Sequence, residues 1–479
     1  MNADLKSNGI RTIQADQLRR DSAPILSRFN LGLVGVFILV GIGLAFISVY
    51  WSFALAAMVM FSLVAGWFMV HQPEIGLLAV VFVIPFEDFN QPAALGPFSI
   101  AKIIGVAAIA AYAIHYFISG EERKLVNAPQ NIYVFLLLAA VIVSDLVAID
   151  PEYAVDKTFK LVRVMAFYFL VINIIRTRAS MHRVFWVMII TGLISASYGL
   201  YEYYFTPEVL DDLRITGTYD DPLGLAYAMA ALLPIVWYLF KHNSKPVARI
   251  FLAVTGLIFL YSLILTGARS GILIALVVML LIALREKHAV LYIAFVSLII
   301  VVGLLIMPVS VQTRLGLTTG ADRAAEASAE ASTERRSTYT PYAIQLFLEN
   351  PIIGSGLGGF AQSYSQSEYR FIRGEDDVRR VAHNMYLEFA VGAGLLGLIP
   401  FIMLLVSAML GLQRAIGEAP SLLYRDMAKT VQASLLTFLL VGFFSSSQYD
   451  KPLWLLIGLA VVVPLLINQE NRQEKGLPA

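Results

Sequence analysis

Runs of about 20 apolar residues recur along nearly the whole chain, and they limit its possible folds more than any other feature. As a helix, a run of this length crosses a hydrocarbon core of about 30 Å. Because the runs are continuous rather than alternating, they predict membrane helices and not barrel strands. Of the 479 residues, 58% are hydrophobic and 14% are charged, which a soluble protein does not need. We therefore expect an all-α polytopic membrane protein.

The apolar runs predict about 12 to 14 spans. The third is short and ends in Pro85, so the count is open by one or two. The expected spans are residues 31–50, 52–70, 74–85, 99–119, 131–148, 154–175, 183–203, 222–240, 249–266, 270–284, 289–307, 384–412, 430–444 and 452–467.

Lysine and arginine collect in the loops on one side of these spans. Cytoplasmic loops carry such an excess, so this side and the N-terminal tail are predicted to lie inside. The tail does not resemble a cleaved signal peptide, whose apolar core would begin earlier. The expected organisation is a cytoplasmic tail (1–30), membrane helices with short loops (31–307), a large outward loop (308–383), further membrane helices (384–467) and a second cytoplasmic tail (468–479).

The outward loop is too long for a simple turn, and its composition changes along its length. Residues 321–336 are rich in Ala, Glu and Arg and predict a helix or a mobile flap, whereas 337–349 predict a helix on the membrane surface. This helix should end at Asn350, before Pro351. The glycines that follow, including Gly354 and Gly356, predict either an anion-binding turn or a flexible connection.

Residues 392–397 match the pattern GxGxxG but lie inside an apolar span with no preceding strand. Small residues that allow close helix packing explain them better than a dinucleotide site.

His383 is the only one of the six histidines predicted to face outward. It opens a span, and Asn384 after it is a good helix cap, so the histidine could be incidental. The functional alternative is a base of near-neutral pKa held at a rigid helix end.

Two outward arginines, Arg214 and Arg269, lie in separate loops. Snorkelling toward the lipid headgroups explains such residues without function. Two guanidinium groups could instead clamp a diphosphate. Asp220 and Asp221 could bind a metal, but two adjacent carboxylates without a third ligand favour solvation or helix capping.

Charged residues inside the bilayer also need an explanation. Asp145 lies on one expected span, and the next span carries Lys157, Lys160 and Arg163 at a spacing of three, which places the cations near one stripe. They predict either a structural ion pair with Asp145 or a cationic lining for a lipid phosphate. With no cysteine, the chain has neither disulfides nor a Cys-ligated metal.

In their order along the chain, four motifs resemble the O-antigen ligase and polymerase superfamily. They are Arg214 with the following Gly-Thr-Tyr, the segment 266–271 with Arg269, Asn350-Pro351 with the glycines after them, and His383-Asn384-Met385-Tyr386-Leu387. The resemblance covers about residues 214–401, while the first spans match only in being hydrophobic. It implies a many-helix fold of the lipid-dependent glycosyltransferase kind in the bacterial inner membrane.

The resemblance also implies the chemistry. Members transfer a glycan from an undecaprenyl-diphosphate carrier at the periplasmic face, without a metal, a nucleotide donor or another cofactor. Arg214 and Arg269 would bind the diphosphate, and His383 would activate the acceptor hydroxyl. The expected substrate-binding residues are Gly354, Gly356, Asn384, Lys160 and Arg163, together with Arg335 and Arg336, near which the family often carries an arginine.

The expected partners are the lipid-linked glycan donor, a glycan or lipid A core acceptor and the lipid bilayer, with no nucleic acid. Ligase and polymerase share the donor and differ in the acceptor, and these residues do not separate them. A secondary transporter is the alternative of another class, although the sequence lacks a convincing inverted repeat.

Overall fold

The protein is represented by a computed structural model that describes residues 53–87, 89, 99–118, 125–207, 214–219, 221–318, 323–371 and 380–475. These residues form helices and turns and contain no strand, which confirms the expected all-α class. The predicted span 31–50 lies outside them. The chain divides into two units, Met1–Phe68 and Met69–Ala479. Helix α3 (Phe53–His71) begins in the first unit, and the description below concerns the second.

Six helices within the described ranges are long and apolar enough to cross a membrane, or seven if the bent pair of residues 59–71 and 73–86 counts as one span. The six are α5 (Ile100–Ile118), α8 (Arg178–Phe205), α9 (Pro222–His242), α10 (Pro246–Leu265), α16 (Met385–Glu418) and α18 (Lys451–Glu474). The other predicted spans in the described ranges also coincide with helices, namely α4 (Pro73–Val83), α6 (Gln130–Asp145), α7 (Pro151–Ile174), α11 (Arg269–Leu284), α12 (Ala289–Ile306) and α17 (Leu422–Val441). The count of 12 to 14 crossings stays a prediction.

The helix starts follow from their first residues. Helices α4, α7, α9, α10 and α18 each carry proline at the first or second position, where the missing N–H is not needed. Asp150 caps α7 by accepting from the Tyr153 N–H at 3.1 Å. Asp221 caps α9 by accepting from the Leu223 N–H, so this carboxylate has the capping role that the sequence favoured.

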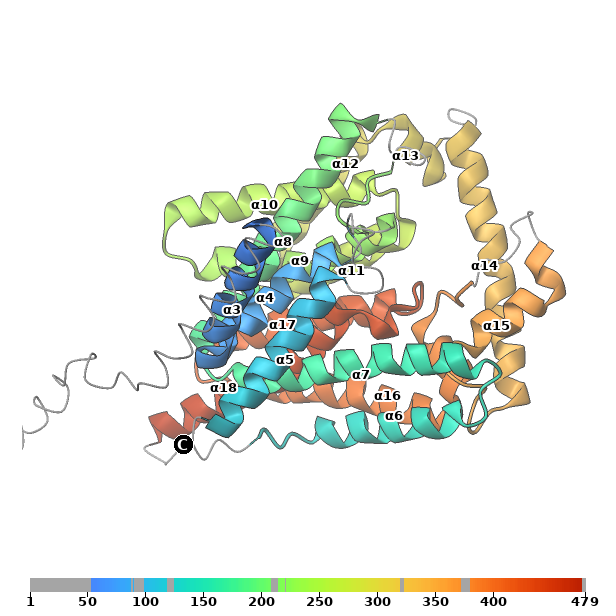
Figure 1. The fold of residues 1–479 in the computed structure, drawn as a ribbon. Coiled ribbons are helices and arrows are strands. Elements are labelled where there is room, and N and C mark those ends of the chain that lie inside the picture. Colours follow the sequence, from blue (N-terminus) through green and yellow to red (C-terminus); the bar gives the residue numbers. More distant parts are fainter. Residues whose placement is uncertain are drawn as a thin grey trace, which may run out of the picture. The chain divides into compact units, whose positions relative to one another are not determined.

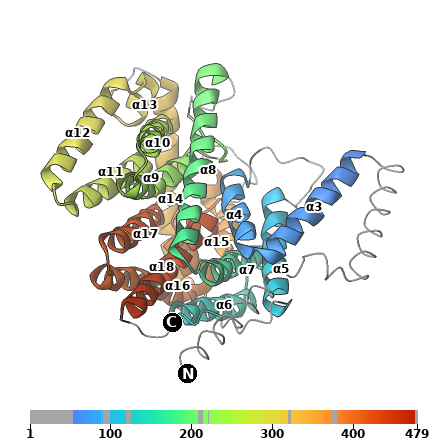
Figure 2. The same ribbon diagram turned by 90° about the vertical axis from the view of Figure 1, so that its left-hand side faces the viewer.

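The helices form two packed groups, one around α16 and one around α9. Helix α16 packs against α6, α17 and α18, and α9 packs against α8, α10, α11 and α17. Figure 1 shows α6, α7 and α16 side by side, with α14 (Arg323–Glu349) and α15 (Gly359–Gln366) standing across one of their ends. In the view turned by 90°, many of these helices are seen nearly end-on, with α14 and α15 behind them (Figure 2). The long loop thus covers one end of the helices.

Polar contacts hold the opposite end together. Lys241 Nζ lies 2.8 Å from Glu286 Oε2 and 3.0 Å from Asp426 Oδ2, and His242 Nε2 lies 2.8 Å from the same Asp426 atom. These contacts join the ends of α9 and α17 to the loop after α11. His242 therefore has a structural partner at the end predicted to be inside.

The long loop contains one helix where the sequence suggested two segments. Helix α14 (Arg323–Glu349) runs through Pro341 without a break and ends before Asn350-Pro351, as predicted. Tyr339, Ala343 and Leu346 of α14 are buried against Phe360 and Tyr364, whereas Ile344 and Leu348 are exposed. One face of α14 therefore packs on α15, and the exposed apolar residues remain consistent with a helix on the membrane surface. The side chains of residues 323–329 and 331–336 lie outside the described part.

Candidate active site

The tight turn between α10 and α11 brings arginines from two other segments together. Gly267 turns the chain with a φ of +59°, which glycine adopts without strain. A Cβ at this position would lie 3.1 Å from Arg314 Cδ and 3.7 Å from Arg214 Nε. Glycine is therefore needed both for the backbone and for the space that the two arginines occupy.

Backbone carbonyls fix the orientation of two of these guanidinium groups. The Arg214 Nε–H donates to the Thr266 carbonyl at 2.7 Å, and the Arg269 Nε–H donates to the Arg314 carbonyl at 2.7 Å. Each bond constrains the plane of a guanidinium, whose fork is suited to phosphate oxygens. The structure thus places Arg214 and Arg269, which the sequence assigned to one role, around the same turn.

Arg314 completes this group, and the sequence analysis did not select it. It ends α13 (Val309–Arg314), and only 8% of its surface is exposed. A signal was available, because an arginine just beyond the predicted outward end of a span runs against the positive-inside bias. We refer to Arg214, Arg269 and Arg314 as the arginine cluster.

His383 has an unusual backbone conformation. Its φ is +51°, and it is the only non-glycine residue with positive φ in the part of the chain that the structure describes. Its ring stacks on Tyr339 of α14, with centroids 5.8 Å apart and planes at 22°. Such a conformation costs about 1 to 3 kcal/mol and is found most often at functional sites.

The residues on both sides of His383 hold it in this conformation. Asn384 caps α16 by accepting from the N–H groups of Tyr386 at 3.0 Å and Leu387 at 3.1 Å. The Ala382 N–H donates to Glu388 Oε1 at 2.6 Å, which closes the chain back onto the first turn of the helix. The predicted cap is confirmed, and a functional role for the histidine stays a prediction.

Glu388 is a second residue that the sequence analysis passed over. Its carboxylate is buried and also accepts from the Ser446 hydroxyl at 3.1 Å. Lys157 interacts with it electrostatically, and the Lys157 ammonium lies 4.7 Å from the ring centroid of Tyr153 and 5.8 Å from that of Tyr449. Burial raises the pKa of the Tyr449 hydroxyl, so this neighbour of Lys157 stays neutral. A buried acid and a half-buried cation therefore lie behind the histidine turn.

Helix α14 connects the arginine cluster with the histidine. It packs against α13, which carries Arg314, and against α16, which begins after His383. The arginine cluster lies at the α10–α11 turn and the end of α13, and His383 directly precedes α16. A ligand with a diphosphate and a reacting hydroxyl would find anion-binding groups in one and a proton acceptor in the other.

The glycine-rich turn has a structural role. The Gly354 N–H donates to the Asn350 carbonyl at 3.0 Å, and the Gly356 N–H donates to the Ser144 hydroxyl at 3.1 Å. A Cβ on Gly354 would lie 2.6 Å from the Gly392 carbonyl. Because both N–H groups already have protein acceptors, the geometry favours close packing over an anion site.

The glycine-rich turn packs against residues 392–397 of α16. Helix α16 is interrupted at Gly394, with φ +58° and ψ −160°. The Leu395 and Leu396 N–H groups donate to the carbonyls of Pro351 and Ile352 at 2.8 and 3.1 Å. The expected role in close packing is present: the segment packs against the loop backbone, and the Ser144 hydroxyl of α6 donates to the Gly392 carbonyl.

The three cations of α7 do not act as one stripe. Lys160 Nζ pairs with Asp156 Oδ2 at 3.0 Å, and Arg163 is exposed. Asp145 instead accepts from the Thr158 hydroxyl at 2.5 Å. The ion pair that the sequence suggested between Asp145 and these cations is therefore absent among the contacts of the described residues, and Lys157 alone turns toward the histidine region. The side chains of Arg335 and Arg336, and the whole of Asp220, lie outside the described part.

A comparison with protein families finds a match over part of the chain. Residues 254–402 match the family described as O-antigen ligase. This segment, which is less than half of the chain, is what makes the protein similar to the O-antigen ligase superfamily. The match supports glycosyltransferase activity of the ligase or polymerase type. A comparison with curated proteins finds no match.

The matched segment contains most of the candidate site. Arg269, Arg314, His383 and Glu388 lie within it, whereas Arg214 precedes it. The structure connects Arg214 to the matched segment through its hydrogen bond to Thr266.

Proposed function

We propose that the protein transfers a glycan from an undecaprenyl-diphosphate-linked donor to an acceptor hydroxyl. The observation that supports this most is the convergence of Arg214, Arg269 and Arg314 around Gly267. Guanidinium groups from three segments at one turn present several N–H donors, and their forked geometry is suited to the oxygens of a diphosphate. The similarity of residues 254–402 to the O-antigen ligase family supports a lipid-linked glycan as the molecule that carries this diphosphate.

In the proposed reaction, the acceptor oxygen attacks the anomeric carbon of the donor sugar. The new carbon–oxygen bond forms as the bond to the diphosphate breaks, and the electron pair of that bond leaves with the diphosphate oxygen. The arginine cluster stabilises the negative charge that develops there. Neutral His383 accepts the hydroxyl proton, and direct displacement inverts the anomeric configuration. The residues given these roles need no metal ion.

The proposed setting is the periplasmic face of a bacterial inner membrane, with the N-terminus in the cytoplasm. The positive-inside bias supports this orientation, as does the gathering of the arginine cluster, His383 and α14 at the other end of the helices. In this arrangement the loop 308–383 separates the membrane helices 31–307 from the helices 384–467.

Two kinds of acceptor are compatible with the proposed reaction. A ligase would transfer the glycan to a terminal acceptor such as lipid A core, and a polymerase would transfer it to another lipid-linked repeat unit. A deletion strain separates them, because loss of a ligase strands long chains on the carrier, whereas loss of a polymerase leaves single repeats on the final acceptor.

The proposal is tested with the purified chain in detergent, lipid-linked donor and acceptor, and no ion gradient. Transfer of radiolabelled glycan, retained in the presence of a chelator, is the expected result. A secondary transporter would give no product under these conditions, and product formation that required a divalent cation would contradict the metal-free mechanism.

A further inference from the structure

The molecule contains a pocket far along α16 from the candidate active site. It has a volume of about 530 Å³ and lies between the start of α6, the second half of α16 and the second half of α18. Helix α16 begins next to His383 and reaches the pocket with Met403, continuing to Glu418. We infer that this pocket binds a phospholipid with an anionic headgroup. The inference is independent of the proposed transfer reaction.

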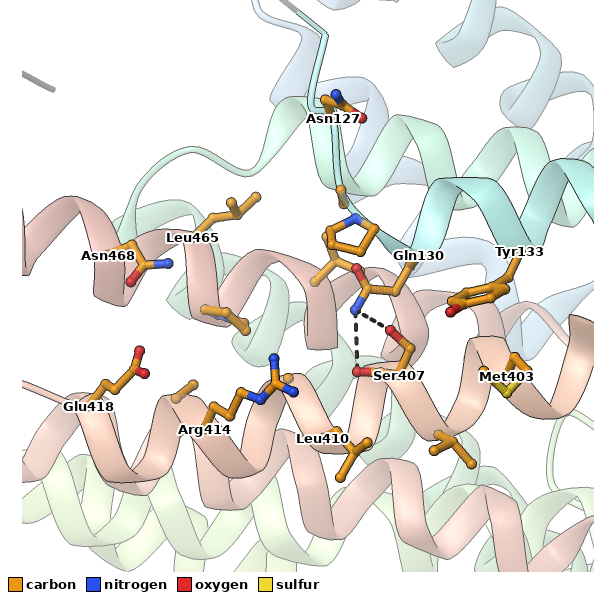
Figure 3. A pocket seen from close by; sticks show the side chains of 17 residues that line it. Asn127, Gln130, Tyr133, Met403, Ser407, Leu410, Arg414, Glu418, Leu465 and Asn468 are labelled. Atoms are coloured by element: carbon orange, nitrogen blue, oxygen red, sulfur yellow. Dashed lines mark hydrogen bonds between the residues drawn. The ribbon is translucent and has the colours of Figure 1, made fainter.

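One wall of the pocket is apolar and faces outward. Met403, Val406 and Leu410 line it and are 42%, 44% and 51% exposed. Their spacing of three and four places them on one stripe of α16. Across from them lie Leu465 of α18 and Tyr133 of α6 (Figure 3). Such a stripe suits the first carbons of acyl chains.

The floor is closed by a polar contact between helices. The buried Gln130 side chain donates to the Ser407 carbonyl at 3.3 Å and to its hydroxyl at 3.1 Å, as the dashed lines in Figure 3 show. Because this amide already has its acceptors, a ligand can lie against it without leaving a buried group unpaired.

The other end of the pocket is charged. Arg414 and Glu418 follow the apolar stripe along α16, and Asn468 faces them from α18 (Figure 3). A second pocket shares Glu418 and Asn468 and adds Arg472 and Lys475. Three cations and one carboxylate therefore surround the polar end, and this balance favours an anionic group.

Apolar and cationic parts in sequence along one helix fit an amphipathic ligand rather than a free anion. A soluble phosphate would use the charged end alone and leave the apolar stripe unexplained. The end of a membrane helix is also the depth at which lipid headgroups lie, where each nearby Lys or Arg contributes to attraction of anionic lipid. We therefore commit to a phospholipid.

The test measures lipid binding to the full-length purified chain by native mass spectrometry, with phosphatidylglycerol as the anionic probe and phosphatidylcholine for comparison. Arg414→Gln should weaken phosphatidylglycerol binding by at least about fivefold, the contribution expected of one cation. Arg425→Gln, an exposed arginine at the start of α17 outside both pockets, is the matched control and should change nothing.

A second pair of variants tests the cavity itself. A Cβ on Gly411 would lie 3.7 Å from Gln130 Nε2 and 3.9 Å from Pro464 Cγ, which is ordinary contact, so Gly411→Ala should bind both lipids like the wild type. Gly411→Leu should fill the pocket and abolish binding.

Three results would overturn the inference. Equal losses for Arg414→Gln and Arg425→Gln would indicate general attraction to a basic surface, and full binding by Gly411→Leu would show that the pocket is empty of lipid. Displacement of phosphatidylglycerol by soluble glycerol phosphate would indicate a free-anion site.

Discussion

The strained backbone at His383 allows its chemistry to be separated from its effect on folding. Replacement by alanine should remove most transfer, with a loss of about 10² to 10⁴ in rate, because a general base is deleted. Asparagine is the better control substitution, since it tolerates the left-handed region and is polar. Rates are compared using purified lipid-linked donor at matched amounts of folded protein.

If His383 is the base, His383→Asn should unfold at nearly the wild-type temperature and still be inactive. Near-normal turnover in this variant would contradict the assignment. If the activity of His383→Asn fell only in proportion to a lower unfolding temperature, the role of His383 would be structural, at the start of α16.

Arg314 provides a test of the arginine cluster that the sequence alone did not offer. Arg314→Lys keeps the charge but removes the planar fork, so donor binding should weaken, with KM for the donor rising about tenfold. Arg425→Lys on the exposed start of α17 is the control for a general effect of the exchange. Steady-state kinetics at varied donor concentrations provide the measurement. An unchanged KM for the donor would show that Arg314 does not bind the diphosphate.

At the scale of the elements, the interruption of α16 is the feature most sensitive to a single methyl group. A Cβ on Gly394 would collide with the Ile352 carbonyl, and its φ of +58° disfavours any side chain. Gly394→Ala should therefore destabilise the protein by about 2 kcal/mol or more. Gly417, in the same helix, has no atom within 4 Å of the corresponding position.

Gly417→Ala should consequently be neutral or stabilising by up to about 1 kcal/mol, because alanine favours a helix. Thermal unfolding in detergent compares the two variants. Equal midpoints would show that residues 392–394 are not held against the loop backbone.

Most elements could be predicted because a membrane helix is specified locally. Continuous apolar runs gave the helices, and proline and asparagine marked several of their ends. The break at Gly394 could not be predicted in the same way, since it depends on Pro351 and Ile352, about forty residues earlier in the chain. The expected helix 337–349 is present and runs through Pro341, but it begins earlier, at Arg323, so that the two expected segments form one helix.

At the scale of the whole molecule, the sequence identified the separate parts of the site but not their assembly. Arg214, Arg269 and His383 were selected from their chemistry, their predicted side of the membrane and the family resemblance. The structure adds Arg314, whose carbonyl accepts from Arg269 at the α10–α11 turn, and Glu388, which accepts from the Ala382 N–H. The role of Lys160 and Arg163 in substrate binding stays a prediction, and helical spacing did not reveal that Lys160 pairs with Asp156 on the same helix.

The orientation of the chain in the membrane is the premise of the whole assignment, and the absence of cysteine makes it directly testable. Ser244 lies exposed between α9 and α10, and Gln366 is the exposed last residue of α15. The Lys/Arg bias predicts that the first is cytoplasmic and the second periplasmic.

Single variants Ser244→Cys and Gln366→Cys should therefore differ toward a membrane-impermeant thiol reagent. On intact cells the reagent should label Gln366→Cys, whereas Ser244→Cys should react only after the inner membrane is permeabilised. The cysteine-free wild type measures background, and equal labelling of both variants after permeabilisation shows that both thiols are accessible. Labelling of Ser244→Cys alone on intact cells would place the arginine cluster and His383 on the cytoplasmic side, and the proposed periplasmic reaction could not then take place at this site.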